Sequence, residues 1–191
     1  MSGSDPEMVL NEIWSATDRQ HGETGLYAVL DGARHATIYS AIQKSGFQFE
    51  CLYRGEIDSD LAEAAPYLVR LEPDMPFTHW LIAKGWGDSW GIFLVAAAAL
   101  RDVRQHLRKF LMVYDADGKP LYFRYYDPRV LRVYLPTCNA EELGIFFGPV
   151  QSYMLEDADS RTLLRFTTAS GSLQQQKLPV ARRESDVSGR T

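Results

Sequence analysis

Apolar and polar residues along the chain follow two periods, one typical of strands and one typical of helices. Runs rich in β-branched and aromatic residues predict strands over 26–31, 49–53, 67–71, 91–96, 150–156 and 162–168. Apolar residues spaced three and four apart, bounded by capping residues, glycine or proline, predict helices over 34–45, 60–65, 76–85, 98–110, 128–135 and 139–147. Because the two kinds of element alternate, we expect a layered α/β domain with a mixed β-sheet and flanking helices.

A β-hairpin is expected between the helices at 98–110 and 128–135. Asp117-Gly118 is a strong turn signal, and apolar residues at 111–114 and 121–126 flank it. The hairpin therefore interrupts the alternation of strands and helices and is expected to attach to the layered domain as a separate feature.

The length of 191 residues favours one domain. Residues 1–23 are expected to form a helical or loop lead-in, and residues 24–169 the α/β domain. From Ser170 onward large apolar residues are sparse, so 170–191 is expected to be a flexible polar tail.

The formal net charge of −5 is unevenly distributed along the chain. Residues 1–75 carry a net charge of −8, whereas residues 76–135 carry +4. The pI near 5.4 argues against a nucleic-acid-binding domain, which would have an overall basic surface. An acidic half beside a basic one suits a protein partner.

The sequence predicts a cytoplasmic protein without a membrane partner. Its first residues lack the charge and apolar length of a signal peptide, and no apolar run reaches the length of a membrane span. Cys51 and Cys138 are too far apart for a metal-binding motif and too few for a disulfide framework, so we expect two inert thiols in a reducing compartment.

The segment GDSWG at 87–91 matches the GxSxG nucleophile elbow of serine hydrolases. In that elbow a strand precedes the serine and a helix follows it, whereas here the helix is expected first and the strand second. The histidine required downstream is His106 alone. The pattern therefore favours a tight helix-to-strand connection anchored by Trp86 and Trp90, with a serine hydrolase using Ser89 as the alternative.

No other motif indicates catalysis, a metal or a cofactor. The remaining histidines have no Cys or acidic residue at ligand spacing, and the sequence holds neither a Walker loop nor a GxGxxG motif. The acidic segment 115–118 fits a hairpin turn, since alignment with a calcium loop would place Arg124 at the bidentate glutamate position. These residues favour a binding protein over an enzyme and hold no recognisable cofactor motif or metal site; a nuclease built from scattered carboxylates such as Asp31, Glu50 and Glu56 stays open as an alternative.

Arginine and tyrosine gather in the segment LYFRYYDPRVLRVYLP at 121–136. These two residue types contribute much of the binding energy at protein interfaces. A second arginine stripe follows one face of the helix at 98–110. With the two tryptophans, the expected protein-binding residues are Arg101, Arg104, Arg108, Arg124, Tyr126, Arg129, Arg132, Trp86 and Trp90.

We expect the arginines to meet acidic partner surfaces. On that interpretation, charge reversal of Arg129 and Arg132 weakens capture of the partner and leaves folding intact. The alternative is that the tyrosines pack inward and the arginines only solvate a face.

Several stretches of the chain resemble the type VI secretion effector-adaptor domain, a family first catalogued as a domain of unknown function. They are LYAVLDGARHATIY (26–39), CLYRGE (51–56), the segment 65–94 with its WGDSWGIFL block, the segment 103–138 with YFRYYDPRVLR, and LGIFFGPV (143–150). The resemblance covers about residues 24–157. The matching motif positions are Asp31, Gly32, Tyr39, Pro66, Tyr67, Trp86, Gly87, Ser89, Trp90, Gly91, His106, Arg108, Phe123, Arg124, Tyr126, Asp127, Pro128, Arg129 and Arg132.

The resemblance implies a cytoplasmic, non-enzymatic adaptor with the character of a chaperone. Such a protein binds one toxic effector and loads it onto the spike protein of the valine-glycine-repeat class. Larger members carry a further C-terminal region, whereas here a short polar tail follows, so cargo recognition by that region does not transfer to this chain. An immunity-type protein, which also binds a toxin without catalysis, is a second alternative to the adaptor.

Overall fold

The computed structural model describes residues 4–17 and 24–181. Within these ranges, strands pair in the order β2-β3-β1-β4-β7-β8-β9 to form one sheet, and β5 and β6 form a separate hairpin. None of the helices in these ranges has the length and apolar character needed to cross a membrane.

The strands are β1 (Gly25–Asp31), β2 (Phe49–Cys51), β3 (Pro66–Leu71), β4 (Gly91–Ala96), β5 (Met112–Tyr114), β6 (Pro120–Tyr122), β7 (Val150–Glu156), β8 (Thr162–Ala169) and β9 (Ser172–Pro179). The α-helices are α1 (Pro6–Ser15), α2 (Thr37–Lys44), α3 (Ser59–Ala64), α4 (Pro76–Gly85), α5 (Leu100–Leu107), α6 (Pro128–Tyr134) and α7 (Ala140–Phe147), and short 3₁₀ turns are η1 (Gly32–Arg34), η2 (Arg108–Phe110) and η3 (Leu135–Thr137).

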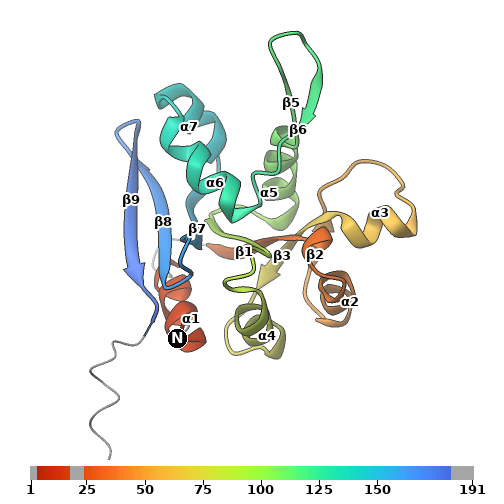
Figure 1. The fold of residues 1–191 in the computed structure, drawn as a ribbon, viewed down its shortest axis with the longest axis vertical. Coiled ribbons are helices and arrows are strands. Elements are labelled where there is room, and N and C mark those ends of the chain that lie inside the picture. Colours follow the sequence, from red (N-terminus) through yellow and green to blue (C-terminus); the bar gives the residue numbers. More distant parts are fainter. Residues whose placement is uncertain (1–3, 18–23, 182–191) are drawn as a thin grey trace, which may run out of the picture.

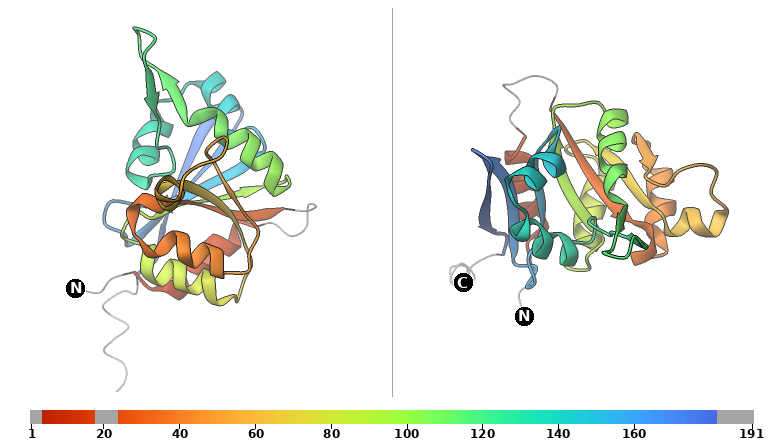
Figure 2. Two further views of the ribbon diagram at one scale, coloured as in Figure 1. Left: turned by 90° about the vertical axis from the view of Figure 1, so that its right-hand side faces the viewer. Right: turned by 90° about the horizontal axis from the view of Figure 1, so that it is seen from above.

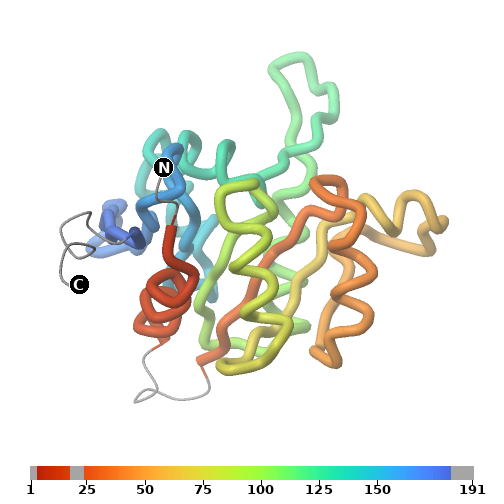
Figure 3. Tube along the Cα trace, turned by 60° about the horizontal axis from the view of Figure 1, so that its bottom comes forward, coloured from red at the N-terminus to blue at the C-terminus, as the bar shows by residue number. Residues whose placement is uncertain are grey.

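Helices cover both faces of the sheet and give the domain three layers (Figures 1 and 2). Apolar residues of α1, α2 and α4 pack on one face, and those of α5, α6 and α7 pack on the other. Figure 3 shows α1, α4 and α2 side by side across the first face. The hairpin of β5 and β6 projects away from the layers, beyond the end of α5 (Figure 1).

The central strands β1 and β4 explain why both faces need a cover. All seven residues of β1 are buried, and successive side chains point to opposite faces. Tyr27 and Val29 belong to the core under α5 to α7, whereas Ala28 and Leu30 belong to the core under α1, α2 and α4. Because the side chains of Leu26–Leu30 are apolar on both sides of β1, each face of the sheet needs a covering layer of helices.

The predicted α/β fold class with flanking helices and a hairpin is confirmed. The large sheet, however, is antiparallel at each pairing of the described strands, where a mixed sheet was expected. Alternating strands and helices favour parallel pairs because a βαβ crossover returns the chain in the same direction. Here neighbouring strands run in opposite directions, as the register from Gly25↔Ala96 to Leu30↔Gly91 between β1 and β4 shows.

The prediction of a flexible polar tail from Ser170 is wrong for its first part. Residues 172–179 form β9, which pairs with β8 along its whole length, from Ala169↔Ser172 to Thr162↔Pro179. Ser170 and Gly171 both have positive φ, at 50° and 75°, as a type I′ hairpin turn requires. β9 is mostly exposed, so it lacks the apolar alternation by which a strand is recognised in a sequence. Residues 182–191 of the expected tail lie outside the described residues.

The N-terminal segment contributes a helix to the core. Asp5 caps α1 by accepting from the N–H of Glu7, and Val9, Leu10 and Ile13 are buried beneath it. The helical part of the expected lead-in is therefore present, and it packs against the sheet as an integral part of the domain.

Cys51 and Cys138 are free thiols, each half-buried. Burial raises the pKa of both groups, which lowers the fraction of reactive thiolate at neutral pH.

Glycine 91 provides a test of the β1–β4 register. A Cβ at this position would overlap the carbonyl oxygen of Val29. We expect Gly91→Ala to lower the free energy of unfolding in urea by about 1–3 kcal/mol, because the clash is with backbone that must shift. Gly144→Ala is the matched control: a Cβ there meets nothing in α7, and alanine favours a helix, so stability is expected to rise by up to about 1 kcal/mol. Equal stability of Gly91→Ala and the native protein would contradict this register.

Candidate protein-binding surface

The GDSWG motif forms the connection between α4 and β4, with the helix before it and the strand after it, as the sequence predicts. Ser89 has a φ of 56° and is buried. Its hydroxyl and its backbone N–H donate to the same oxygen of Glu156, over 3.1 Å and 3.0 Å. The N–H of Gly87 donates to the other oxygen of that carboxylate. The motif thus wraps around a buried acid at the end of β7.

Hydrogen bonds explain how the domain accommodates the Glu156 carboxylate. Burial raises the pKa of Glu156, while the donors of Gly87 and Ser89 act in the opposite direction. Since both carboxylate oxygens accept from this loop, each donor has a buried partner. Ser89 is therefore an anchor of the connection between α4 and β4.

His106 holds a different position from the one that the hydrolase alternative needs. Its Nε2 lies 2.9 Å from the carbonyl oxygen of Phe146, and a Cβ at Gly148 would overlap its ring. Burial lowers the pKa of His106 and so favours the neutral imidazole. His106 and Ser89 are not hydrogen-bonded to each other in the part of the chain that the structure describes. Over the same residues, no group of three or more His, Cys, Asp or Glu side chains is placed to hold a metal ion.

The two tryptophans flank the motif as anchors. Trp90 is buried and packs against Trp80 and His35, with ring centroids 5.4 Å and 5.2 Å apart. Trp86 is half-buried, and its Nε1 donates to the carbonyl oxygen of Ser160 over 2.7 Å. The anchoring interpretation therefore fits both residues, whereas Trp90 as a protein-binding residue is wrong because its ring lies in the core.

Arg124 forms an ion pair with Asp31, at the end of β1. The Asp31 side chain is only 1% exposed, and it also caps η1 by accepting from the N–H of Ala33. Tyr126 is buried nearby, with the Arg124 guanidinium 5.9 Å from its ring centroid. A direct partner contact by Tyr126 is thus a wrong prediction, and Arg124 neutralises an internal carboxylate.

Arg129 forms a similar pair with Asp127, the residue that caps α6. Asp127 accepts from the backbone N–H of Arg129 over 2.9 Å, and the guanidinium donates to both carboxylate oxygens. Burial acts to raise the pKa of Asp127, but the hydrogen bonds from Arg129 outweigh it and hold the pKa below its ordinary value. Arg132, one turn further along α6, is half-buried, and its charge acts on Glu156. The arginines of residues 121–136 therefore act largely on buried carboxylates of the domain.

The arginine stripe of α5 lies at an open surface. Arg101, Arg104 and Arg108 line a cleft of about 310 Å³ together with Arg54 from the loop after β2. The Nε of Arg104 lies 3.4 Å from Oε2 of Glu50 and donates to the carbonyl oxygen of Cys51. Partial burial lowers the pKa of the Arg108 guanidinium, and the like charges of Arg104 and Arg54 add to that effect.

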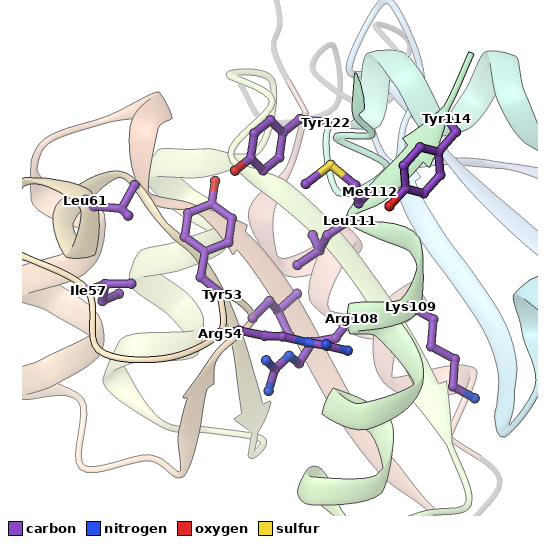
Figure 4. Close-up of a pocket in the computed structure, with 11 residues that line it drawn as sticks. Tyr53, Arg54, Ile57, Leu61, Arg108, Lys109, Leu111, Met112, Tyr114 and Tyr122 are labelled. Carbon is purple, nitrogen blue, oxygen red and sulfur yellow. The ribbon is translucent and has the colours of Figure 1, made fainter. Parts of the chain in front are cut away.

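A groove of about 730 Å³ adjoins this cleft, between the loop that leads into α3 and the β5–β6 hairpin (Figure 4). Ile57 and Leu61 lie on one side of it and Met112 and Tyr114 on the other, as Figure 4 shows. Its remaining lining residues are Leu52, Tyr53, Arg54, Arg108, Lys109, Leu111 and Tyr122. We call this region, with its lining residues, the hairpin groove.

The hairpin exposes apolar side chains that a folded domain normally covers. Tyr114 and Tyr122 are 69% and 71% exposed, and Met112, Val113 and Leu121 are also exposed. A two-stranded hairpin without a covering layer is only marginally stable, and contiguous exposed apolar surface marks an interaction site. The hairpin groove is therefore the candidate binding surface.

The sequence indicates the hairpin but does not reveal the groove. Ile57 lies in the loop before α3 and Leu61 in α3 itself, and the hairpin residues that they face across the groove lie some fifty positions away in the sequence. The available signal is the pair Tyr114 and Tyr122, which flank the Asp117-Gly118 turn in strands too short to form a core. Of the nine predicted residues, Arg108 lines the hairpin groove, and Arg101 and Arg104 line the adjoining cleft.

Comparison with family models places residues 26–144 in DUF4123, described as a domain of unknown function. The chain belongs to this family. A search of curated proteins and a search of solved structures each found no match for the chain. The DUF4123 region includes the GDSWG motif, the hairpin and both inward-facing arginines, and it ends within α7, before β7 begins.

The pair between Asp127 and Arg129 gives a pH-dependent prediction. We expect Arg129→Gln to lower the free energy of unfolding at pH 7 by about 1 kcal/mol, since solvent screens the half-exposed guanidinium. Because the pKa of Asp127 is lower in the folded protein than in the unfolded chain, its ionised form stabilises the fold at pH values above the ordinary pKa of 3.8. This contribution is lost as the pH falls through the pKa of the folded state. The difference between the variant and the native protein is therefore expected to shrink below about pH 4 in urea titrations.

Arg132→Gln is the matched control, because it changes an arginine of the same helix without removing a hydrogen bond to Asp127. It is expected to alter stability by less than about 0.5 kcal/mol. A deficit of Arg129→Gln that stays constant from pH 7 to the acid range would contradict the role given to Asp127. The earlier expectation that charge reversal at Arg129 leaves folding intact conflicts with this pair and is tested by the same measurement.

Proposed function

We propose that the protein is a non-enzymatic adaptor that binds a toxic effector and loads it onto the valine-glycine-repeat spike protein of a type VI secretion system. The resemblance of the sequence to effector adaptors supports this role. The observation that carries the proposal is the exposed hairpin beside an open, apolar groove with a basic rim, a combination that suits capture of another polypeptide. On this proposal the protein works in the cytoplasm.

The hairpin groove is assigned to the effector. Its exposed apolar side chains and the basic residues beside them offer the mixed contact surface that capture of another polypeptide needs. A groove of ordinary size with a polar rim also suits binding that must later be reversed.

The polar clusters give the adaptor a rigid frame for this surface. The Glu156 carboxylate fixes the loop before β4, and the Asp31 and Asp127 carboxylates fix the segment after β6. Because the hairpin begins after α5 and ends just before this segment, its base is held at both sides. The groove can then keep its shape while the partner changes.

The test uses the effector and spike proteins encoded beside this gene. We expect the double substitution Tyr114→Ser and Tyr122→Ser to abolish co-purification of the effector, because exposed tyrosines at an interface commonly contribute about 1–2 kcal/mol each. Stability is expected to stay within about 0.5 kcal/mol, since both side chains are exposed in the free protein.

The matched control is Val133→Ser with Ile145→Ser, which removes two apolar side chains of comparable exposure, 66% and 59%, from α6 and α7. This variant is expected to capture the effector as the native protein does. Two results would contradict the proposal: failure of the native protein to bind the effector, or protection of cells from the toxin in the absence of the spike protein. The second result would indicate an immunity protein.

A further inference from the structure

The basic residues of the hairpin groove have no acidic counterpart within it. Arg54, Arg108 and Lys109 line the groove, and no Asp or Glu is among the lining residues. None of these three side chains forms an ion pair with any residue of the described ranges 4–17 and 24–181. Arg104 differs, because it lies beside Glu50 and is held by the carbonyl oxygen of Cys51.

Of these three basic residues, Arg108 has a buried donor atom without a hydrogen-bond acceptor within the described ranges. Its Nε is buried and has no hydrogen-bond partner among the residues that the structure describes. A buried donor without an acceptor destabilises the free protein, and the neighbouring positive charge of Arg54 adds repulsion. An acceptor with negative charge would relieve both effects at once. A carboxylate suits the planar guanidinium, which can donate to both of its oxygens.

Apolar residues flank these charges on both sides. Ile57 and Leu61 face Met112 and Tyr114 across the groove, and the rings of Tyr53 and Tyr122 lie 6.4 Å apart (Figure 4). A ligand that satisfied the arginines alone would leave this apolar surface in water. A complementary ligand therefore carries apolar side chains and carboxylates within a few residues of one another.

We propose that the hairpin groove binds a short acidic and amphipathic segment of the effector. Carboxylates of that segment pair with Arg54 and Arg108. Apolar side chains of the same segment pack between Ile57 and Leu61 on one side and the hairpin on the other. This inference rests on the proposed function, and it adds the chemistry by which the effector is recognised.

An acidic polypeptide is favoured over a nucleic acid. The whole chain carries a net charge of −5, and residues 1–75, which supply the α3 side of the groove, carry −8. A long polyanion would meet this negative charge on leaving the groove, whereas a short segment stays within the basic part. Aliphatic walls such as Ile57 and Leu61 also suit apolar side chains better than a sugar-phosphate backbone.

Charge reversal tests the proposal on the purified complex of adaptor and effector. We expect Arg54→Glu with Arg108→Glu to weaken the affinity at least about tenfold in a titration by calorimetry, and to reduce the dependence of affinity on salt. Folding is expected to be unaffected, because neither side chain has a partner within the described residues. Lys84→Glu with Arg161→Glu is the control, since it makes the same change of net charge at exposed positions outside the groove, and it is expected to bind normally.

The outcomes separate this inference from the proposed function. If the native protein fails to bind the effector, the adaptor function fails and the inference falls with it. If the complex forms and the groove variant binds as tightly as the control variant, the adaptor function stands and the acidic segment is refuted.

Cross-linking identifies the segment itself. A photoreactive phenylalanine analogue in place of Tyr122 is expected to label an effector peptide that contains Asp or Glu beside apolar residues. Replacing those acidic residues by lysine is expected to restore binding to the variant with Arg54→Glu and Arg108→Glu. Labelling of the spike protein, labelling of a peptide without acidic residues, or displacement of the effector by a single-stranded oligothymidylate would each overturn the proposal.

Discussion

A buried carboxylate at the end of the central strand determines how the chain returns from the hairpin to the domain. Asp31 is almost without solvent contact, and a buried charge is tolerated only when it is paired and hydrogen-bonded. Its partner, Arg124, follows β6 by two residues, so the ion pair fixes the point at which the chain re-enters the core. Tyr125 and Tyr126 are buried directly after it, and Asp127 then caps α6. The projection of the hairpin and the placement of α6 both depend on this one requirement.

The same requirement explains why polar residues that look functional in the sequence are largely structural. Ser89, Arg124 and Arg129 each satisfy a buried acid, on three neighbouring segments of the fold. Each of these acids also accepts from backbone N–H groups, so the loss of one side-chain partner weakens its hydrogen bonding and leaves the backbone donors in place.

Much of the fold follows from local patterns in the sequence. The strand at β1, the capped helix α7 and the hairpin turn at Asp117-Gly118 are fixed by burial period, capping residues and turn chemistry within a few positions. The direction of neighbouring strands cannot be predicted from local sequence, because it depends on which strands pair in the sheet. β9 was missed for a related reason: its stability comes from pairing with β8, and the Ser170-Gly171 turn was the single local signal for it.

The binding surface was predictable only in part. The arginine stripe of α5 is visible as a helical period, and Arg108 does reach the hairpin groove. Tyr126 and Trp90, by contrast, are buried in the core and do not lie at this surface. The neighbouring sequence of an aromatic residue does not show whether its ring is buried or exposed. The groove arises where the α3 loop comes close to the hairpin, and that proximity is a property of the tertiary structure.

The hairpin of β5 and β6 also bears on how long a captured partner stays attached. Its strands hydrogen-bond to each other and no third strand or helix covers them within the described residues, so the hairpin is held to the domain mainly at its base. On the proposed function, any mobility that the hairpin loses when the effector binds is subtracted from the contact energy, so the complex is weaker than its buried area alone would imply. A carrier that releases its load, as the proposed function requires, benefits from this subtraction, because dissociation is faster than from a rigid surface of equal size.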